Sequence, residues 1–339
     1  MSEAPALPTL SILLPVRNEA NNLARCLDGI FANDYPHDRL ELLVIDGQSD
    51  DATLDIVRQY QQRHPRIRLL DNPQRLPYTA LNIALAHATG EYLVRVDARS
   101  MIPTNYLRTC IETLRETGAD NVGGVQRQYG VTPRQEAIAL ATGHRFGVGN
   151  AQFRLGTQSG FVDTVYLGCF RRELFDRIGH FDEDGPVISE DAGFNQRIRD
   201  AGGRVYLRAD LVVRYPAKAT FGALARQYFI YGGAKAHFVL KYRKFTAWRQ
   251  LVPLLFLVGL VGSLLVGLWW TPALVLFALA AGTYLGVDLA VAVTLAARHR
   301  RWDLLPFLIA TFPCIHFPWP VGFLVRLCEG STPGRHWRG

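Results

Sequence analysis

Acidic side chains stand at three places where this chain changes from one element to the next. Asp46 and Asp97 each follow an apolar run, and the pair Glu190 and Asp191 begins an amphipathic segment. A carboxylate can accept a proton, hydrogen-bond a ligand or hold a hard cation. In open α/β sheets the ligand lies outside the carboxyl ends of the strands, so Asp46 and Asp97 are expected to face a ligand. We therefore predict that the three acidic positions share one cavity.

The first hundred residues alternate short apolar runs with amphipathic segments, which is the pattern of strands and helices in turn. We predict strands over Leu10–Val16, Leu40–Ile45, Ile67–Leu70 and Tyr92–Val96. Helices are predicted between them, from Asn22 to about Ile30, over Ala52–His64 and over Thr79–Ala88. This alternation favours a doubly wound α/β sheet with parallel strands.

The pattern changes after a helix predicted over Asn105–Thr117. Further strands are predicted over Asn121–Gln128, Val165–Phe170 and Val205–Val213, and the first of them turns the sheet towards a mixed one. A helix is predicted from Ser189 to Asp200, where two glycines end it. Residues 130–163 are rich in glycine and indicate no regular element.

The C-terminal part of the chain is strongly apolar. The 339 residues are 49% hydrophobic, and the excess lies after residue 250. We predict membrane spans over Leu251–Trp270 and Ala273–Ala297, each long enough to cross about 30 Å of lipid. A third segment, Leu304–Leu327, contains four prolines and either spans or re-enters. Before them, Thr220–Lys244 is predicted to form a pair of interfacial helices.

Charge placement indicates a membrane surface and excludes nucleic acid as the expected partner. The formal net charge is +7, with basic residues next to the apolar segments and no aromatic-basic pattern of RNA binding. Basic residues before the first span and after the second favour a cytosolic first domain in a multi-pass protein of the plasma (inner) membrane. The start of the chain lacks a signal-peptide pattern, and the five cysteines lack metal or redox spacing.

Several sequence blocks in this order resemble the family 2 glycosyltransferases, which have the GT-A fold. The blocks are LSILLPVRNEANNL, LLVIDGQSDDAT, ALNIALAHATGEYLVRVDARS and SEDAGFNQRIRDAGGRVYL. Others, such as GADNVGG and VDTVYLGCFRRELFDRIG, are similar to the membrane-anchored, succinoglycan-type glucosyltransferases of exopolysaccharide assembly. The resemblance implies a GT-A domain over residues 1–216, interfacial helices over 217–249, a membrane region over 250–328 and a tail over 329–339.

The resemblance also implies roles for individual residues. By the resemblance, Pro15, Arg17, Glu19, Asp46 and Asp97 are expected to bind the nucleotide-sugar. Arg75, Arg99 and Glu190 are expected there from their charge and position. Asp97 would be the first carboxylate of a DxD-like element and would hold Mg²⁺ or Mn²⁺ together with the diphosphate. Asp191 would be the catalytic base, because a helix start both positions a carboxylate and keeps it ionised. Weaker acceptor contacts are implied for Arg154, Asp163 and Gln227.

Arg99 departs from the family pattern, because it stands where the DxD element has its second acid. A guanidinium has no lone pair with which to bind a metal. Either another group completes the site, or Arg99 itself neutralises the diphosphate and the enzyme depends less on a divalent cation.

The predicted function is transfer of a hexose, most simply glucose, from a UDP-sugar to a polyprenyl-diphosphate-linked saccharide, with inversion. It would serve exopolysaccharide or cell-surface glycan biosynthesis, beside membrane lipids and other assembly proteins. Two alternatives stay open: transfer to polyprenyl phosphate itself, and an inactive nucleotide-sugar-binding scaffold.

Overall fold

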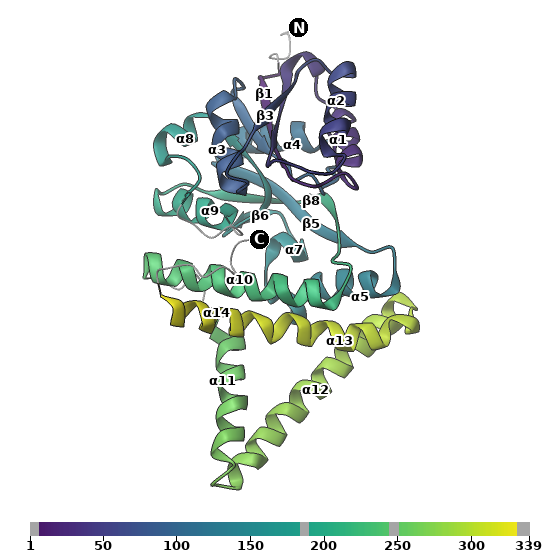
Figure 1. The fold of residues 1–339 in the computed structure, drawn as a ribbon, viewed down its shortest axis with the longest axis vertical. Coiled ribbons are helices and arrows are strands. Elements are labelled where there is room, and N and C mark those ends of the chain that lie inside the picture. Colours follow the sequence, from purple (N-terminus) through teal and green to yellow (C-terminus); the bar gives the residue numbers. More distant parts are fainter. Residues whose placement is uncertain (1–6, 184–189, 244–250, 331–339) are drawn as a thin grey trace. The chain divides into compact units, whose positions relative to one another are not determined.

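The computed structural model describes residues 7–183, 190–243 and 251–330. The chain forms two compact units, and each is described by itself (Figure 1). The first contains residues 1–127 and 152–216, and the second contains residues 128–151 and 217–339. The first unit ends at Pro216. The segment 128–151 differs from the prediction, since it belongs to the second unit.

An eight-stranded mixed sheet forms the centre of the first unit, in the order β3-β2-β1-β4-β7-β5-β8-β6. The parallel half consists of β1 (Leu10–Val16), β2 (Leu40–Asp46), β3 (Ile67–Asp71) and β4 (Tyr92–Arg95). The other half consists of β5 (Asn121–Tyr129), β6 (Gly160–Val162), β7 (Tyr166–Arg171) and β8 (Val205–Pro216). Strand β7 runs antiparallel to β4 and β5, and β6 runs antiparallel to β8. This is a GT-A-like sheet, and its change from parallel to mixed agrees with the prediction.

Helices flank the sheet in the first unit. They are α1 (Leu23–Phe31), α2 (Thr53–Arg63), α3 (Pro77–His87), α4 (Tyr106–Thr117), α7 (Gln152–Leu155), α8 (Glu173–Ile178) and α9 (Glu190–Asp200), with a short 3-10 turn, η1 (His37–Arg39). The observed ends of β2 and β4 each differ by one residue from the predicted ends at Ile45 and Val96. The helix start predicted at Ser189 lies outside the described residues.

Alternation along the strands sends side chains to two separate cores. Ile12 and Val94 pack with residues of α1, α2 and α4 on one face. Leu13 and Leu93 pack with residues of α3, α8 and α9 on the other face. Because side chains in a strand alternate with a period of two, Arg95 lies on the same face as Leu93. The end of β4 therefore points a guanidinium towards the face that α9 covers.

The second unit begins with α5 (Pro133–Thr142) and α6 (Arg145–Val148) and continues with α10 (Phe221–Tyr242). Ile138 and Ala141 of α5 are fully buried in one cluster with Leu308 and Phe312. This shared core explains why 128–151 groups with the C-terminal part. The predicted interfacial helix pair is wrong: one continuous helix, α10, covers residues 221–242, and Lys244 lies outside the described residues.

The apolar C-terminal helices are α11 (Leu251–Val266), α12 (Pro272–His299), η3 (Trp302–Leu304), α13 (Leu305–His316) and α14 (Pro318–Glu329). Helices α11 and α12 contact each other and are joined by a turn that exposes two tryptophans, Trp269 and Trp270. Helix α10 packs closely on α14: a Cβ on Gly232 would lie 1.9 Å from the Trp319 carbonyl oxygen. Small residues permit such close approach of helices.

Two segments of the described chain are long and apolar enough to cross a membrane, Pro272–His299 and Trp302–Glu329. The first agrees with the predicted span over 273–297. The predicted span over 251–270 forms a helix of only 16 residues, because the chain turns at Gly267 and Leu268. The predicted tail, residues 329–339, lies outside the described residues after Gly330.

Candidate functional site

The loops after β1, β2 and β3 hold one another at the carboxyl edge of the sheet. Asn18, Gln48 and Arg75, one in each loop, have positive φ angles of 53°, 57° and 60°. The backbone N–H of Asn18 donates to Ser49 Oγ at 3.0 Å, and Arg75 Nε donates to Gln48 Oε1 at 2.8 Å. Non-glycine residues with positive φ are uncommon and often occur at functional sites. These loops contain the predicted residues Arg17 and Arg75.

Asp46 is buried and turns the loop after β2. Its exposed fraction is 5%, and it accepts hydrogen bonds from Ser49 Oγ at 2.6 Å and from the Ser49 backbone N–H at 3.0 Å. The loop lies against Arg17, since a Cβ on Gly47 would come within 3.3 Å of the Arg17 side chain. Pro15 and Val16 pair with Ile45 and Asp46 on the neighbouring strand. The predicted base-pocket residues therefore share one sheet edge.

Glu19 and Arg99 form an ion pair between the β1 and β4 loops. Arg99 Nε donates to Glu19 Oε1 at 2.5 Å, and Asn22 donates to the other Glu19 oxygen at 3.1 Å. Partial burial opposes the charge of Arg99, but Tyr215 and Glu19 outweigh it and raise the arginine pKa. Arg99 is therefore directed at a protein carboxylate in this structure.

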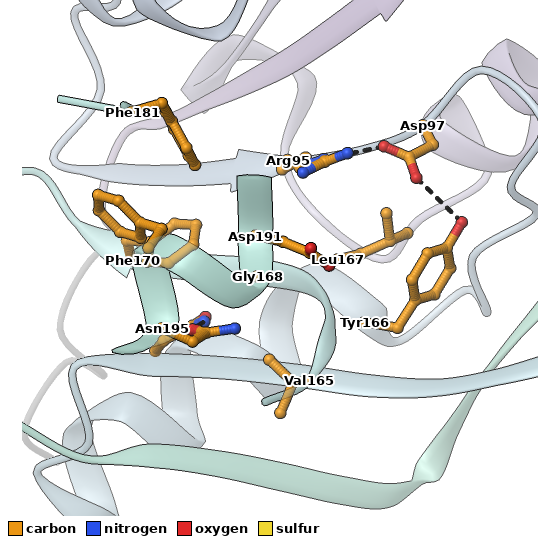
Figure 2. Close-up of a pocket in the computed structure, with 12 residues that line it drawn as sticks. Arg95, Asp97, Val165, Tyr166, Leu167, Gly168, Phe170, Phe181, Asp191 and Asn195 are labelled. Carbon is orange, nitrogen blue, oxygen red and sulfur yellow. Dashed lines mark hydrogen bonds and ion pairs between the residues drawn. The ribbon is translucent and has the colours of Figure 1, made fainter. Parts of the chain in front are cut away.

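A second ion-pair network joins β4 to the start of α9. Arg95 Nε donates to Asp97 Oδ1 at 2.9 Å, and Arg95 Nη2 lies 2.7 Å from Glu190 Oε1. Figure 2 shows the Arg95 and Asp97 side chains meeting beside Asp191. Burial lowers the pKa of Arg95, but the carboxylates of Asp97, Glu190 and Asp191 more than reverse this and raise it. The guanidinium is therefore a permanent positive charge among three acids.

Asp97 has partners on both of its oxygens. Tyr166 Oη donates to Asp97 Oδ2 at 3.1 Å and also lies 2.7 Å from Ser100 Oγ (Figure 2). The Asp97 side chain nevertheless keeps 28% of its surface exposed. Because a carboxylate carries about four lone-pair sites, Asp97 can still accept or coordinate a ligand.

Asp191 and Asp97 line the same cavity, together with Arg95 and with residues of β7 and α9. Its volume is about 20 Å³, room for about one water molecule. Burial raises the pKa values of both Glu190 and Asp191, against the lowering effect of Arg95. Asp191 also accepts a hydrogen bond from the Ala192 backbone N–H at 2.7 Å. A carboxylate that has a raised pKa and lines a cavity is suited to act as a general base.

The predicted acidic positions are brought together only in part. Asp46 is not among the residues that line the cavity of Asp97 and Asp191. It ends β2, and β1 separates β2 from β4, so two strand spacings, about 10 Å, divide the Asp46 and Asp97 positions. Asp46 therefore lies along the same sheet edge as Asp97 but outside the lining of this small cavity.

The weaker acceptor residues lie apart from this cavity's lining. Arg154 is 6% exposed and places its guanidinium 5.4 Å from the ring of its neighbour Phe153. Asp163 is exposed, beyond the end of β6. Gln227 belongs to the second unit and donates to Tyr231 Oη at 2.8 Å.

Sequence reasoning missed Arg95, Tyr166 and Asn195, which all line the cavity. Asn195 is buried and accepts a hydrogen bond from the Asn121 side chain at 2.6 Å. One signal was available: an arginine inside an otherwise apolar strand needs a carboxylate partner, because an unpaired buried charge is very costly. The tyrosine and the asparagine carry no such signal.

A divalent cation has limited support from the protein side chains. No group of three or more His, Cys, Asp or Glu residues in the described part of the chain is arranged to hold one. Asp97 fits as a single carboxylate ligand, and a diphosphate could supply further oxygens. Arg99 occupies the position of the second acid but has no lone pair for a metal, and its side chain is paired with Glu19.

Comparison with known proteins agrees with the sheet and the site. The family described as Glycosyl transferase family 2 matches residues 11–179. The Succinoglycan biosynthesis protein ExoA of Rhizobium meliloti (strain 1021) is 29% identical over 320 residues, covering 94% of each chain. A Dolichyl N-acetyl-alpha-D-glucosaminyl phosphate 3-beta-D-2,3-diacetamido-2,3-dideoxy-beta-D-glucuronosyltransferase of Methanococcus voltae is 24% identical, covering 95% of this chain and 98% of the relative.

A solved structure is also similar over most of the chain. It is the mannosyltransferase PcManGT from Pyrobaculum calidifontis, in complex with GDP-Man and Mn²⁺. The TM-score is 0.57 and the identity is 26%, with 91% of this chain and 86% of that chain covered. The similarity extends beyond the residues that the family matches.

Proposed function

Since residues 11–179 are a family 2 glycosyltransferase domain and this chain is a glycosyltransferase, we propose that it transfers a hexose from a UDP-sugar to a polyprenyl-diphosphate-linked saccharide. Two relatives support a lipid-linked or polysaccharide product by their names, which refer to succinoglycan biosynthesis and to a dolichyl phosphate glycan. The similar solved structure holds GDP-Man, so GDP-mannose is the competing donor to test.

One observation carries the catalytic part of the proposal: Asp97 and Asp191 line one cavity together with Arg95. Asp97 lies at the carboxyl end of a parallel strand, where α/β folds bind nucleotides. Asp191 lies in the first turn of α9, where the helix dipole favours its ionised form. The two acids thus suit different tasks in one reaction.

The reaction is a single displacement at the anomeric carbon. Asp191 removes the proton of the acceptor hydroxyl while the hydroxyl oxygen forms a bond to that carbon on the face opposite the leaving group. The bond between the anomeric carbon and the diphosphate oxygen breaks, and the nucleoside diphosphate leaves with the electron pair. The sugar configuration is inverted because only one displacement occurs.

The donor is bound along the carboxyl edge of β1, β2 and β4. We assign the nucleoside to the pocket of Pro15, Arg17 and Asp46, where the loops are locked together. The diphosphate is assigned to Asp97 and to Arg75, whose side chain contacts Gln48 in the loop after β2. A divalent cation held by Asp97 and the diphosphate oxygens would neutralise the charge that develops on the leaving group.

The apolar C-terminal helices support the choice of a lipid-linked acceptor. Exposed leucine, valine and tryptophan side chains cover α11 and α12, and helices of this composition prefer a bilayer to water. We propose that the chain resides in the plasma (inner) membrane, with the catalytic unit cytosolic and α10 at the membrane surface. Other polysaccharide-assembly proteins are candidate neighbours there.

The experiment is a transfer assay with the full chain in lipid. Radiolabelled UDP-glucose, UDP-galactose and GDP-mannose are each supplied with membranes that contain lipid-linked saccharides, and the lipid fraction is analysed by size. The proposal expects label from a UDP-sugar on a lipid-linked oligosaccharide, and no label with Asp191→Asn. Label on polyprenyl phosphate alone, or transfer from GDP-mannose only, would replace the proposed acceptor or donor.

A further inference from the structure

Arg95 is a buried arginine that joins two carboxylates from distant parts of the chain. Its side chain is 14% exposed, and those of Asp97 and Glu190 are 28% and 7% exposed. Asp97 follows β4, whereas Glu190 begins α9, almost a hundred residues later. Two different nitrogens of one planar guanidinium contact the two acids, so the angle between the contacts is set by the guanidinium itself.

The arrangement bridges the two sides of the proposed reaction. Asp97 belongs to the donor side, and Glu190 directly precedes the proposed base Asp191. Since Glu190 and Asp191 share the first turn of α9, a force that holds Glu190 also orients the turn that presents Asp191. Arg95, Asp97 and Asp191 all line the same cavity, and Figure 2 shows the contact between Arg95 and Asp97.

Structural stability does not readily account for the network. Burying an ion pair costs desolvation energy that its Coulomb attraction only sometimes recovers, and apolar replacements are often as stable. A further Arg95 nitrogen, Nη1, is buried and has no hydrogen-bond partner among the described residues. A buried donor without a partner is a cost that a bound oxygen atom would remove.

We propose that Arg95 is a positioning residue, which holds Asp97 and the Glu190-Asp191 turn in the arrangement that transfer requires. Its remaining nitrogen, Nη1, donates to an oxygen of the bound donor or acceptor. The inference rests on the proposed function only through the roles of Asp97 and Asp191.

The test compares Arg95→Lys and Arg95→Met with a matched control, Arg171→Met, in the full chain in lipid. Arg171 lies on the neighbouring strand β7 and donates to Tyr92 Oη at 2.9 Å, away from the cavity lining. We expect kcat to fall about 100-fold for both Arg95 variants, because lysine keeps the charge but cannot make the forked contact. KM for the acceptor should stay within about threefold, and Arg171→Met should keep the wild-type kcat.

A double-mutant cycle separates positioning from packing. If Arg95 acts through Glu190, then Arg95→Met with Glu190→Gln should lose little more kcat than Arg95→Met alone. Additive losses, or full activity in Arg95→Lys, would overturn the inference. Circular dichroism melting curves identify any variant that does not fold, and Arg95→Lys then carries the test, since it retains a charge for both acids.

UDP binding distinguishes failure of this inference from failure of the proposed function. Calorimetric titration of UDP with Mn²⁺ needs no acceptor and no turnover. We expect both Arg95 variants to bind UDP about tenfold more weakly than Arg171→Met, because Asp97 is displaced. Equal UDP affinities would refute the positioning role even if no transfer assay succeeds. If the Arg95 variants bind UDP more weakly as expected, but the wild type transfers no sugar, the positioning role stands and the proposed reaction is refuted.

Discussion

Asp191 experiences opposing influences on its charge. Burial in the cavity wall raises its pKa, while Arg95 and the Ala192 backbone N–H lower it, and the balance is a raised pKa. A carboxylate of raised pKa holds a proton more firmly and is therefore a stronger base once it is ionised. The local environment thus improves the residue for the task of removing a hydroxyl proton.

The activity should therefore fall on the acid side at a higher pH than an ordinary aspartate would cause. The base must be ionised, so kcat/KM should increase with pH through an apparent pKa higher than that of an ordinary aspartate. Asp191→Asn should lose about 100-fold to 10,000-fold in kcat. Asp176→Asn, an exposed acid on α8, serves as the control. An unchanged rate in Asp191→Asn would show that another group is the base.

The environment of Arg99 leads to a prediction about how a metal chelator affects sugar transfer. Because Arg99 is paired with Glu19, we expect a divalent cation, and not Arg99, to neutralise the diphosphate. We expect excess EDTA to abolish transfer and Mn²⁺ to restore it, since Asp97 alone cannot neutralise a leaving diphosphate. Transfer that persists in EDTA and is lost in Arg99→Gln would instead support direct neutralisation by Arg99.

At the scale of elements, β4 is the strand that places the site. It pairs with β1 on one side and with β7 on the other, and it delivers Arg95 and then Asp97 to the sheet edge. Gly90 lies two residues before its first residue, Tyr92, and donates its backbone N–H to Ser11 Oγ at 2.7 Å. The entry of β4 into the sheet thus depends on a close contact with β1.

Gly90→Ala should disturb this entry. A Cβ at Gly90 would lie 2.5 Å from the Ser11 backbone nitrogen, so strand β1 or β4 must move. We expect a loss of about 1–3 kcal/mol in the free energy of unfolding of the first unit. Gly160→Ala is the matched control, because nothing lies within 4 Å of its Cβ position. Amide hydrogen exchange measures the protection of β4 in both variants. Equal protection of β4 in Gly90→Ala and Gly160→Ala would contradict the prediction.

At the scale of the whole molecule, the chain combines a catalytic unit with a unit of apolar helices. The core of the second unit is built from α5, α10, α12 and α13. Strands β6, β7 and β8 of the catalytic sheet separate α5 from the other three helices in the sequence. Helix α12 in contrast exposes apolar side chains such as Leu276 and Leu279. An exposed apolar surface of this kind is stable in lipid and costly in water.

The full chain should therefore stay with membranes after an alkaline carbonate wash and be released by detergent. Replacing Leu285 and Leu289, two exposed residues near the middle of α12, with lysine should weaken this retention. Each lysine near the bilayer centre costs about 2.5–3.5 kcal/mol. Val131→Lys changes an exposed apolar residue outside these helices and should have no effect. Quantitative release of the wild type by carbonate would contradict membrane insertion.

The sequence by itself determined the order of the strands and α-helices over residues 10–117 and the ends of β1, and it placed Asp97 after a strand and Asp191 at a helix start. It did not predict the helices α5, α6 and α7 or the strand β6, which lie in the glycine-rich segment 130–163. Local periodicity and strand ends depend on neighbouring residues, so they can be read from the chain. Only the tertiary structure decided that Asp46 lies two strands from Asp97, that residues 128–151 leave the catalytic unit, and that Arg95 joins β4 to α9. These facts depend on strand order and on contacts between distant segments, which no local pattern encodes.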